Sequence, residues 1–318
     1  MTLSVLLTGV SGFVGHAIAQ SLVQQSIPLT CASRQPLAQE TAAAKVHLIA
    51  DLNADTDWTP CLPGISTVIH CAARVHVMNE TAGDPLALFR SVNVDATLNL
   101  ARQAAAAGAR QFIFLSSVKV NGEETQPGAA FTENTPPHPS DPYGISKYEA
   151  EQALLELAKT TGMAVTIIRP PLVYGPGVRA NFLSMMQWVK KGLPLPLGSI
   201  RNKRSFVYLQ NLVSLVLTCM DNPAAYNEVF LVSDDHDLST TELLQNSAEA
   251  FDLRSRLLPF PPGLLMLLAT LAGRRSAAQR LCQSLQVDIS KARSRLAWTP
   301  PFTVRQGLQA TARHLTRH

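Results

Sequence analysis

The chain comprises 318 residues, of which 46% are hydrophobic and 16% are charged. These proportions supply enough apolar residues for a core and exclude an intrinsically disordered chain. The length fits two domains or one large α/β unit, at roughly 150 residues per domain. The formal net charge is +4, but the Lys and Arg residues are scattered along the sequence. Scattered basic residues argue against a nucleic-acid-binding protein and are compatible with an anionic small-molecule ligand.

The first residues, the longest apolar stretch and the cysteines all bear on the compartment. The chain starts with a strand-like run, without the basic segment and cleavage site of a signal peptide. The apolar stretch at residues 257–272 contains prolines and is shorter than the roughly 20 residues that a spanning helix needs. Five cysteines without a close pair indicate reduced thiols rather than a disulfide framework or a zinc site: Cys31, Cys61, Cys71, Cys219 and Cys282. We expect a soluble cytoplasmic protein with no membrane span, no metal and no nucleic-acid partner.

Short β-rich runs alternate with helix-length segments over the first 170 residues. Such alternation predicts right-handed βαβ crossovers, and hence an α/β fold with a Rossmann-type, doubly wound parallel sheet. The runs are continuously apolar, as expected for strands that are buried on both faces. The predicted strands are residues 3–7, 29–33, 46–51, 67–70, 111–116 and 165–169. The predicted helices are residues 13–25, 86–107 and 143–161.

A glycine-rich turn joins the first predicted strand to the first predicted helix. Gly9 permits a tight turn, Gly12 allows a pyrophosphate to approach the backbone, and Gly15 allows close packing of helix on strand. The N–H groups at the start of the helix favour a negatively charged ligand. Because the required strand and helix flank the loop, we predict a dinucleotide site rather than a turn without ligand. Its predicted residues are Gly9, Ser11, Gly12, Phe13, Val14 and Gly15.

The end of the second predicted strand bears on which dinucleotide is bound. A carboxylate there would hold the ribose 2′-hydroxyl of NAD, but the sequence has Ser33 and Arg34 instead. A hydroxyl and a guanidinium both suit a 2′-phosphate, so NADP(H) is favoured and NAD(H) is the alternative, with Arg34 as a solvated cation. Asp51 and Leu52, at the end of the third predicted strand, are expected near the adenine; a plain loop aspartate is the alternative.

The fifth predicted strand ends in Ser116, and Ser117 follows it at the carboxyl edge of the sheet. Ligands of doubly wound proteins bind at this edge. Ser117 is therefore predicted to hydrogen-bond the oxygen of the reacting carbon. The alternative is a serine that only forms the turn after a strand.

Tyr143 and Lys147 lie one turn apart at the start of the third predicted helix, so their side chains share a face. Asp141 is expected to cap this helix, and Pro142 suits its first position. A tyrosine hydroxyl, with a pKa of about 10, carries protons poorly at neutral pH unless nearby positive charge favours the phenolate. The Lys147 ammonium and an oxidised nicotinamide would both supply such charge, so Tyr143 is the predicted acid/base. The alternative is an amphipathic helix in which the two residues are unrelated.

The alternation of strands and helices ends after Arg169, where prolines and glycines become frequent. Residues 228–232 indicate one further strand that returns to the main sheet, and the chain beyond about residue 235 is mostly helical. We therefore expect an NAD(P)-binding Rossmann domain over residues 1–170, with a return segment near residues 205–235. A smaller, mostly C-terminal substrate domain would comprise residues 171–204 and 236–318.

In chain order these motifs resemble the NAD(P)-dependent epimerase/dehydratase family of the extended short-chain dehydrogenase/reductase superfamily, whose members act on nucleotide sugars. The likeness is carried by residues 8–15, 68–73, 93–97, 116–122, 143 with 147, and 169–176. It implies that Tyr143 is the catalytic acid/base, that Lys147 holds the nicotinamide ribose, and that Ser117 contacts the C4 oxygen of the sugar. A dimer contact through paired helices is common in this superfamily, so the resemblance allows a homodimer, while the sequence itself does not indicate the oligomeric state. The further cofactor contacts that it implies are Cys71, Ala72, Ala73, Asn93 and Pro170.

The later segments resemble the part of that family that binds a nucleotide diphosphate, most often UDP-linked. Asn181 and Arg204 would meet the diphosphate, which a guanidinium can bind in bidentate fashion. Arg280 would be a further diphosphate ligand, or else a solvated helix cation. The implied substrate-binding residues are Ser117, Val118, Lys119, Asn181, Phe182, Leu195, Leu197, Arg204 and Arg280.

Three positions depart from the family pattern. Asn121 replaces a tyrosine, and Lys119 stands where a small or hydroxyl residue is common. Leu172 replaces an asparagine familiar in UDP-galactose epimerases. With the missing carboxylate, these departures favour a 4-keto-reductase of a UDP-4-keto-6-deoxy-N-acetylhexosamine in surface polysaccharide synthesis. A 4-epimerase of a UDP-hexose or UDP-N-acetylhexosamine is the alternative, and a non-catalytic NADP-binding regulator is a remote one.

Overall fold

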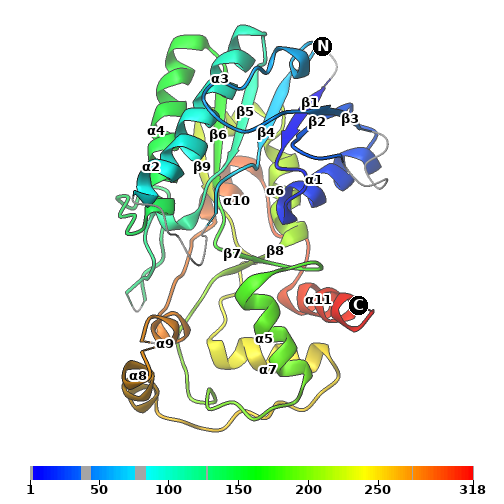
Figure 1. Ribbon diagram of the computed structural model, residues 1–318. Helices are drawn as coiled ribbons and strands as arrows, with labels where there is room; N and C mark the ends of the chain where they lie inside the picture. Colours follow the sequence, from blue (N-terminus) through cyan, green and yellow to red (C-terminus); the bar gives the residue numbers. More distant parts are fainter. Residues whose placement is uncertain (1–2, 37–43, 76–83, 127, 274, 318) are drawn as a thin grey trace.

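A seven-stranded sheet forms the upper part of the computed structural model in Figure 1, which describes residues 3–36, 44–75, 84–126, 128–273 and 275–317. The strand order is β3-β2-β1-β4-β5-β6-β9, and each neighbouring pair is parallel. The strands are β1 (Val5–Thr8), β2 (Leu29–Ser33), β3 (Lys45–Leu48), β4 (Thr67–His70), β5 (Gln111–Leu115), β6 (Ala164–Arg169) and β9 (Glu228–Leu231). This is the strand order of a Rossmann-type sheet extended by one strand, so the predicted fold class is confirmed.

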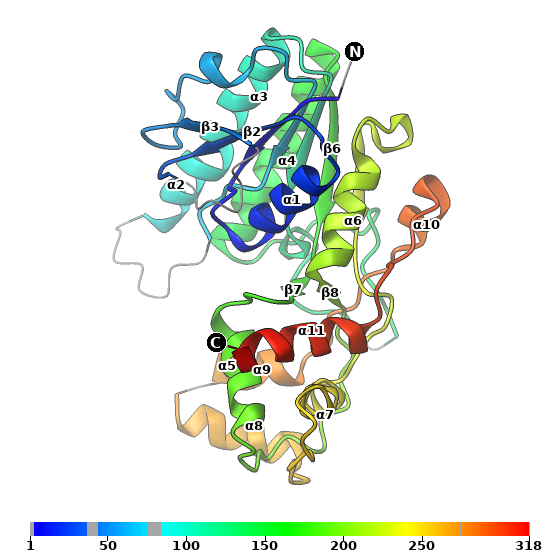
Figure 2. The same cartoon turned by 90° about the vertical axis from the view of Figure 1, so that its right-hand side faces the viewer.

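Helices cover both faces of this sheet (Figures 1 and 2). One face carries α1 (Phe13–Gln24) and α6 (Leu209–Cys219), which pack against each other. The other face carries α2 (Pro85–Arg90), α3 (Ala96–Ala106) and α4 (Pro142–Thr161). Successive residues of a strand point to opposite faces, so Ile113 of β5 joins the first apolar layer whereas Phe112 and Phe114 join the second. This explains the continuous apolar runs in the sequence.

Two predicted elements differ from the structure. The run at residues 46–51 contributes only β3, whose residues are exposed or half-buried, because among the described residues it is the edge strand and pairs with β2 alone. The single helix expected at residues 86–107 is divided into α2, a π-helical turn at Ser91–Asp95, and α3. The wider turn buries Asn93, whose side chain bonds other backbone and side-chain groups.

The lower lobe is assembled from segments that follow β6. A two-stranded parallel sheet, β7 (Leu172–Tyr174) with β8 (Phe206–Tyr208), links it to the upper part. Its helices are α5 (Ala180–Lys190), α7 (Thr240–Ala250), α8 (Pro262–Leu271), α9 (Arg275–Cys282) and α11 (Val304–Arg317), while α10 (Ser290–Leu296) lies beside β9. Among the described residues, none of the helices has the length and apolar character needed to cross a membrane. The proposed division into a cofactor domain and a substrate domain stays a prediction.

A buried histidine ties the centre of the sheet to α3. His70, at the end of β4, lies with its Nδ1 2.7 Å from the Thr8 hydroxyl and its Nε2 3.0 Å from the Thr97 hydroxyl. Burial, and secondarily the charge of Lys147, lowers the pKa of His70 to about 3. The imidazole is therefore neutral at physiological pH and acts as a hydrogen-bonding bridge between β1, β4 and α3.

Candidate functional site

The loop between β1 and α1 is a tight turn that only glycine can make. Gly9 has a φ of +75°, and its carbonyl accepts a hydrogen bond from the Gly12 N–H at 2.9 Å. A Cβ on Gly15 would lie 2.2 Å from the Gly9 carbonyl oxygen, and a Cβ on Gly9 would lie 2.6 Å from the backbone nitrogen of Ala72. Both distances are shorter than a van der Waals contact, so a side chain at either position would displace the backbone.

Gly12 is less crowded than Gly9 and Gly15. A Cβ there would meet only the Gly9 carbonyl oxygen, at 3.1 Å. Gly12 is also the N-cap of α1, and no side chain caps the first turn of this helix. The N–H groups of that turn are therefore available to an anion, as a bound pyrophosphate requires.

A pocket of about 570 Å³ extends along this loop and past the ends of β2 and β4. Its walls include backbone at the glycine turn and apolar side chains farther away, which suits the pyrophosphate and the adenosine of a dinucleotide. The residues predicted for the cofactor that line it are Gly9, Ser11, Gly12, Phe13, Val14, Gly15, Ser33, Arg34, Asp51, Leu52, Cys71, Ala72 and Ala73. The structure thus brings together residues from four separate segments of the sequence, and their contacts with a cofactor stay predictions.

The end of β2 presents one exposed cation to this pocket. The Ser33 hydroxyl donates to the Gln35 carbonyl at 2.7 Å and accepts from the Gln35 N–H at 3.3 Å, so it is engaged within its own turn. The Arg34 side chain is 69% exposed and lies 3.8 Å from the Asp51 carboxylate, which is itself exposed. Arg34 is therefore better placed than Ser33 to meet a 2′-phosphate at the rim.

Four residues predicted for the cofactor do not line this pocket: Asn93, Tyr143, Lys147 and Pro170. Asn93 is buried, accepts a hydrogen bond from the Arg74 N–H, and donates to the Arg74 carbonyl and to the Ser146 hydroxyl. It therefore fixes the segment after β4 against α4. Pro170 follows β6, and its carbonyl accepts from the Val118 N–H at 3.0 Å.

Ser117 and Tyr143 come together at the carboxyl edge of the sheet, close enough for the Ser117 hydroxyl to lower the pKa of Tyr143. Ser117 follows β5, and Asp141 caps α4 by accepting from the Gly144 N–H at 2.7 Å, which sets the position of Tyr143 in the first turn. The Tyr143 ring is half-buried and packs edge-to-face on Phe89. Burial and the charge of Asp141 raise the pKa of Tyr143 to about 12, and the nearby Ser117 hydroxyl opposes this rise.

Lys147 shares the Tyr143 face of α4 but is directed at β5. Its side chain is buried, and Nζ donates to the Leu115 carbonyl at 2.7 Å and lies 4.2 Å from the centre of the Phe114 ring. Burial lowers the pKa of Lys147 to about 8. We expected the Lys147 ammonium to lower the pKa of Tyr143. Lys147 is not among the groups that shift this pKa.

A buried ion pair that was not predicted from the sequence lies behind these residues. Arg169, at the end of β6, donates to Glu151 of α4 with Nε at 3.0 Å and Nη2 at 2.5 Å, and both side chains are almost fully buried. The Glu151 carboxylate also accepts from the Ser116 hydroxyl, and Arg169 Nη1 donates to the Asn121 side-chain oxygen at 3.1 Å. Asn121 thus serves this network and does not line the described pockets. The signal in the sequence was a glutamate one helical turn after Lys147.

The residues predicted for the substrate lie in several separate environments. Val118 is buried in the short helical turn after β5, and the Lys119 ammonium pairs with Asp141 and Glu123. Phe182 is buried and stacks on Tyr174, with ring centres 5.3 Å apart, while the preceding Asn181 is exposed.

The other predicted substrate residues lie in the lower lobe. Leu195 pairs with Leu257 in an isolated bridge, and the Leu197 carbonyl accepts from the Thr241 hydroxyl. Arg204 donates to the carbonyls of Arg280 and Gln283, so its guanidinium holds the end of α9. Burial lowers the pKa of Arg204. The substrate roles of these residues stay predictions.

Arg179 was not predicted from the sequence, although it lines the glycine-loop pocket. It also lines a neighbouring pocket on the outer side of α1. A guanidinium beside the uncapped N-terminus of α1 adds positive potential where a pyrophosphate would lie. The available signal was an arginine two residues after Gly177, in a turn rich in Gly and Pro.

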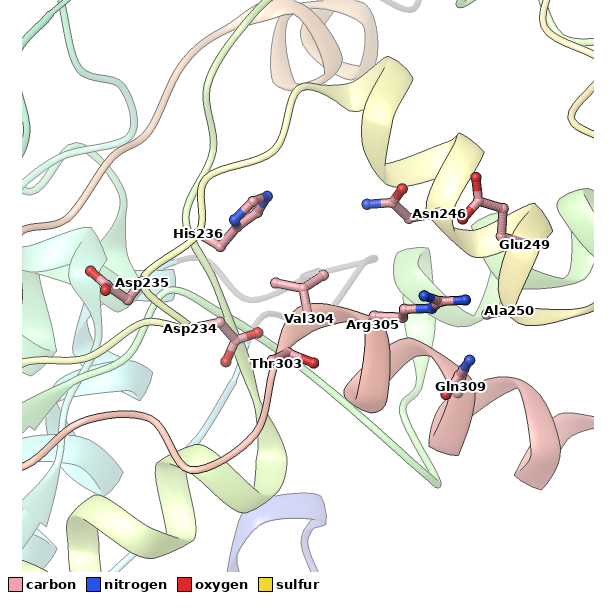
Figure 3. Close-up of a pocket in the computed structure, with 10 residues that line it drawn as sticks. All are labelled: Asp234, Asp235, His236, Asn246, Glu249, Ala250, Thr303, Val304, Arg305 and Gln309. Atoms are coloured by element: carbon pink, nitrogen blue, oxygen red, sulfur yellow. The ribbon is translucent and has the colours of Figure 1, made fainter.

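Figure 3 shows another pocket, of about 450 Å³, between α7 and α11. At its inner end the Asp234 carboxylate accepts from the Tyr174 hydroxyl and the Asn211 amide, each at 2.7 Å. Asp235 pairs with Arg293. This pocket shares no lining residue with the glycine-loop pocket and includes none of the residues predicted from the sequence.

Comparison with known proteins identifies the family. The family described as NAD dependent epimerase/dehydratase matches residues 5–233. The chain is 46% identical to the UDP-glucose 4-epimerase of Vibrio cholerae over 314 residues, which cover 98% of this chain and 95% of that protein. Two solved structures share the fold: UDP-glucuronic acid 4-epimerase from Bacillus cereus in complex with NAD (TM-score 0.76, 19% identity, 99% of both chains) and RMD from Pseudomonas aeruginosa complexed with NADPH (TM-score 0.73, 23% identity, 98% of this chain and 99% of that one). The chain belongs to the NAD dependent epimerase/dehydratase family, as its motifs indicated.

Proposed function

We propose that this enzyme interconverts the C4 epimers of a UDP-hexose, with UDP-glucose and UDP-galactose as the first pair to test. The observation that carries the proposal is the 46% identity to the UDP-glucose 4-epimerase of Vibrio cholerae along 98% of the chain. The Ser117–Tyr143 pair supports the same chemistry, because a hydrogen-bonding group beside a proton carrier suits an alcohol that is oxidised and then reduced again.

The residues at the carboxyl edge of the sheet would divide the proton chemistry. Tyr143 would accept the proton of the C4 hydroxyl during oxidation and return it during reduction, while Ser117 would hold the same oxygen by a hydrogen bond. Bound NAD(P) supplies hydride acceptance and hydride return at C4. Lys147, with a pKa of about 8, would be mostly charged at neutral pH and would favour the phenolate form once the ligands exclude water.

The cofactor is NAD or NADP by family, and the choice between them rests on Arg34. Its exposed guanidinium suits a 2′-phosphate, whereas its ion pair with Asp51 offers it a partner when NAD is bound. We propose that the cofactor lies along the glycine-loop pocket with its pyrophosphate at the N-terminus of α1. An epimerase can work with either NAD or NADP, because the hydride returns to the substrate and the same cofactor molecule serves many turnovers.

A 4-keto-reductase is the second candidate. The observation that favours it is the end of β2, where the chain itself has Ser33, Arg34 and Gln35 and so supplies no carboxylate of its own. A reductase consumes one reduced cofactor in each turnover, and NADPH is the usual cellular source. Leu172, which departs from the epimerase pattern, is 41% exposed on β7.

Two reactions distinguish these candidates. Purified protein is incubated with UDP-glucose and no added cofactor, and we expect UDP-galactose to form; UDP-N-acetylglucosamine is tested in the same way. In the other arm the protein receives NADPH and a UDP-4-keto-6-deoxy-N-acetylhexosamine, and the absorbance of the reduced nicotinamide is followed. Stoichiometric loss of NADPH without epimerisation in the first arm would overturn the epimerase in favour of the reductase. Tyr143→Phe serves as the inactive control in both arms.

A further inference from the structure

Helix α8 lies at the outer end of the lower lobe (Figures 1 and 2) and exposes an apolar stripe. Leu264, Leu267, Leu268 and Leu271 follow the spacing i, i+3, i+4, i+7 and therefore share one face. Their exposed fractions range from 43% to 77%, and no residue of α8 is buried. A clustered apolar face of this kind usually marks an interaction surface.

The charges around this stripe have a single sign. Residues 253–287 contain no Asp or Glu. The same segment contains five arginines: Arg254, Arg256, Arg274, Arg275 and Arg280. Arg254, Arg256 and Arg275 are exposed, and Arg274 lies outside the described residues. An apolar helix face that is flanked in the sequence by arginines is complementary to an anionic lipid surface, where leucines enter the acyl boundary and arginines meet headgroups.

We propose that α8 lies in the interfacial plane of an anionic bilayer and attaches the protein peripherally. A second copy of this chain fits the observations less well. Four leucines on a ten-residue helix offer far less than the roughly 800 Å² per partner of a stable interface, and two such surfaces would bring like-charged arginines together.

The attachment would be mechanically connected to the predicted nucleotide-binding segment. Before α8, the Leu258 N–H donates to the Leu195 carbonyl at 2.8 Å, and the Gly198 N–H donates to the Leu258 carbonyl at 2.9 Å. After α9, the Leu285 N–H donates to the Lys203 carbonyl at 2.9 Å. Residues 195–203 are thus fixed to both ends of the α8–α9 segment, so a membrane-bound protein would hold them close to the lipid surface.

Vesicle flotation with the full chain tests this proposal and requires no knowledge of the reaction. We expect the protein to float with vesicles of phosphatidylcholine and phosphatidylglycerol and to bind much less to phosphatidylcholine alone. Leu267→Gln/Leu271→Gln should lower the partition coefficient about tenfold or more, because two leucines no longer enter the apolar layer. Arg254→Gln/Arg256→Gln should lower binding about fivefold per arginine, and only for the anionic vesicles.

The matched control replaces exposed leucines elsewhere. Leu48 on β3 and Leu193 after α5 are 63% and 46% exposed, so Leu48→Gln/Leu193→Gln should bind as the wild type does. The proposal is overturned if the wild type does not float. It is also overturned if Leu267→Gln/Leu271→Gln and Leu48→Gln/Leu193→Gln bind the vesicles equally. It is also overturned if Leu267→Gln/Leu271→Gln converts a dimer to a monomer in sedimentation without a change in flotation, since the stripe would then join two copies. Epimerase assays on the same variants report separately on the proposed function.

Discussion

Replacing Glu151 with glutamine should destabilise the protein strongly, although glutamate and glutamine have side chains of nearly the same shape. The change removes the charge that faces Arg169, which is only 4% exposed. The glutamine NH₂ group would also face a donor of Arg169 or of Ser116, where the carboxylate accepted from both. Breaking a buried ion pair by removing one partner costs about 3–5 kcal/mol, so we expect the free energy of unfolding to fall by about that amount.

Chemical denaturation followed by far-ultraviolet circular dichroism measures this loss, and a double-mutant cycle assigns it. Arg169→Met alone should cost about as much as Glu151→Gln, because it leaves the other charge buried. The double variant should lose far less than the sum, since the glutamine oxygen can still accept from Ser116 and only the glutamine NH₂ group and the Asn121 oxygen lack partners, at about 1–3 kcal/mol each. Additive losses would refute the reasoning.

The same helix provides a matched control. Glu149 pairs with Arg90 at 2.6 Å, but these side chains are 32% and 48% exposed. Glu149→Gln should therefore change the free energy of unfolding by no more than about 1 kcal/mol. A loss at Glu149 equal to that at Glu151 would mean that burial does not set the magnitude.

Three further outcomes follow from the geometry of the site and the core. Tyr143→Phe should lower turnover by about 10²–10⁴ with the folded state and the dissociation constant of the cofactor nearly unchanged. Arg34→Asp should weaken NADPH binding by about ten- to hundredfold and NADH binding far less, because a charge-assisted bond to the 2′-phosphate is worth about 1.5–3 kcal/mol. Burial lowers the pKa of His70 from 6.5 to about 3. Between pH 6.5 and pH 3 the imidazole is therefore protonated in the unfolded chain but not in the folded one, so the free energy of unfolding decreases as pH falls. The contribution amounts to about 2 kcal/mol between pH 6.5 and pH 5, and His70→Gln should remove it from the denaturation curves.

Each of these outcomes has a direct contradiction. Turnover of the Tyr143 variant near that of the wild type would mean that the proton travels by another route. Equal weakening of both cofactors at Arg34 would remove the argument for a 2′-phosphate. If the free energy of unfolding depends on pH in the same way in the His70 variant and the wild type, protonation of His70 is not the cause of the loss of stability.

The parallel sheet was predictable because its signals are local. Apolar runs such as residues 111–115 need only their own composition to be read as buried strands, and the glycine loop carries its turn geometry in three residues. The same reasoning failed for residues 46–51, because the exposure of an edge strand depends on which neighbours exist and not on the strand itself.

The candidate site was predictable where residues share one element or belong to a recognisable motif at the end of a strand. Tyr143 and Lys147 lie one helical turn apart, so their common face follows from helix geometry. Glu151 and Arg169 belong to different elements, and their ion pair appears only when α4 packs on the sheet. The preference for a reductase was drawn from single departures near the site, and the likeness along the whole chain supports the epimerase better.

The return of the chain to the main sheet has a consequence for synthesis on the ribosome. α6 supplies the buried Leu212, Leu215 and Val216 to one face of the sheet. β9 pairs with β6 only after nearly sixty intervening residues, which enter the lower lobe and return through α6. Until residue 231 has left the exit tunnel, the nascent chain presents an uncovered apolar face and an unpaired β6 edge. Non-local pairing of this kind slows folding and exposes surfaces that chaperones bind, so the cofactor-binding part completes late despite containing the N-terminus.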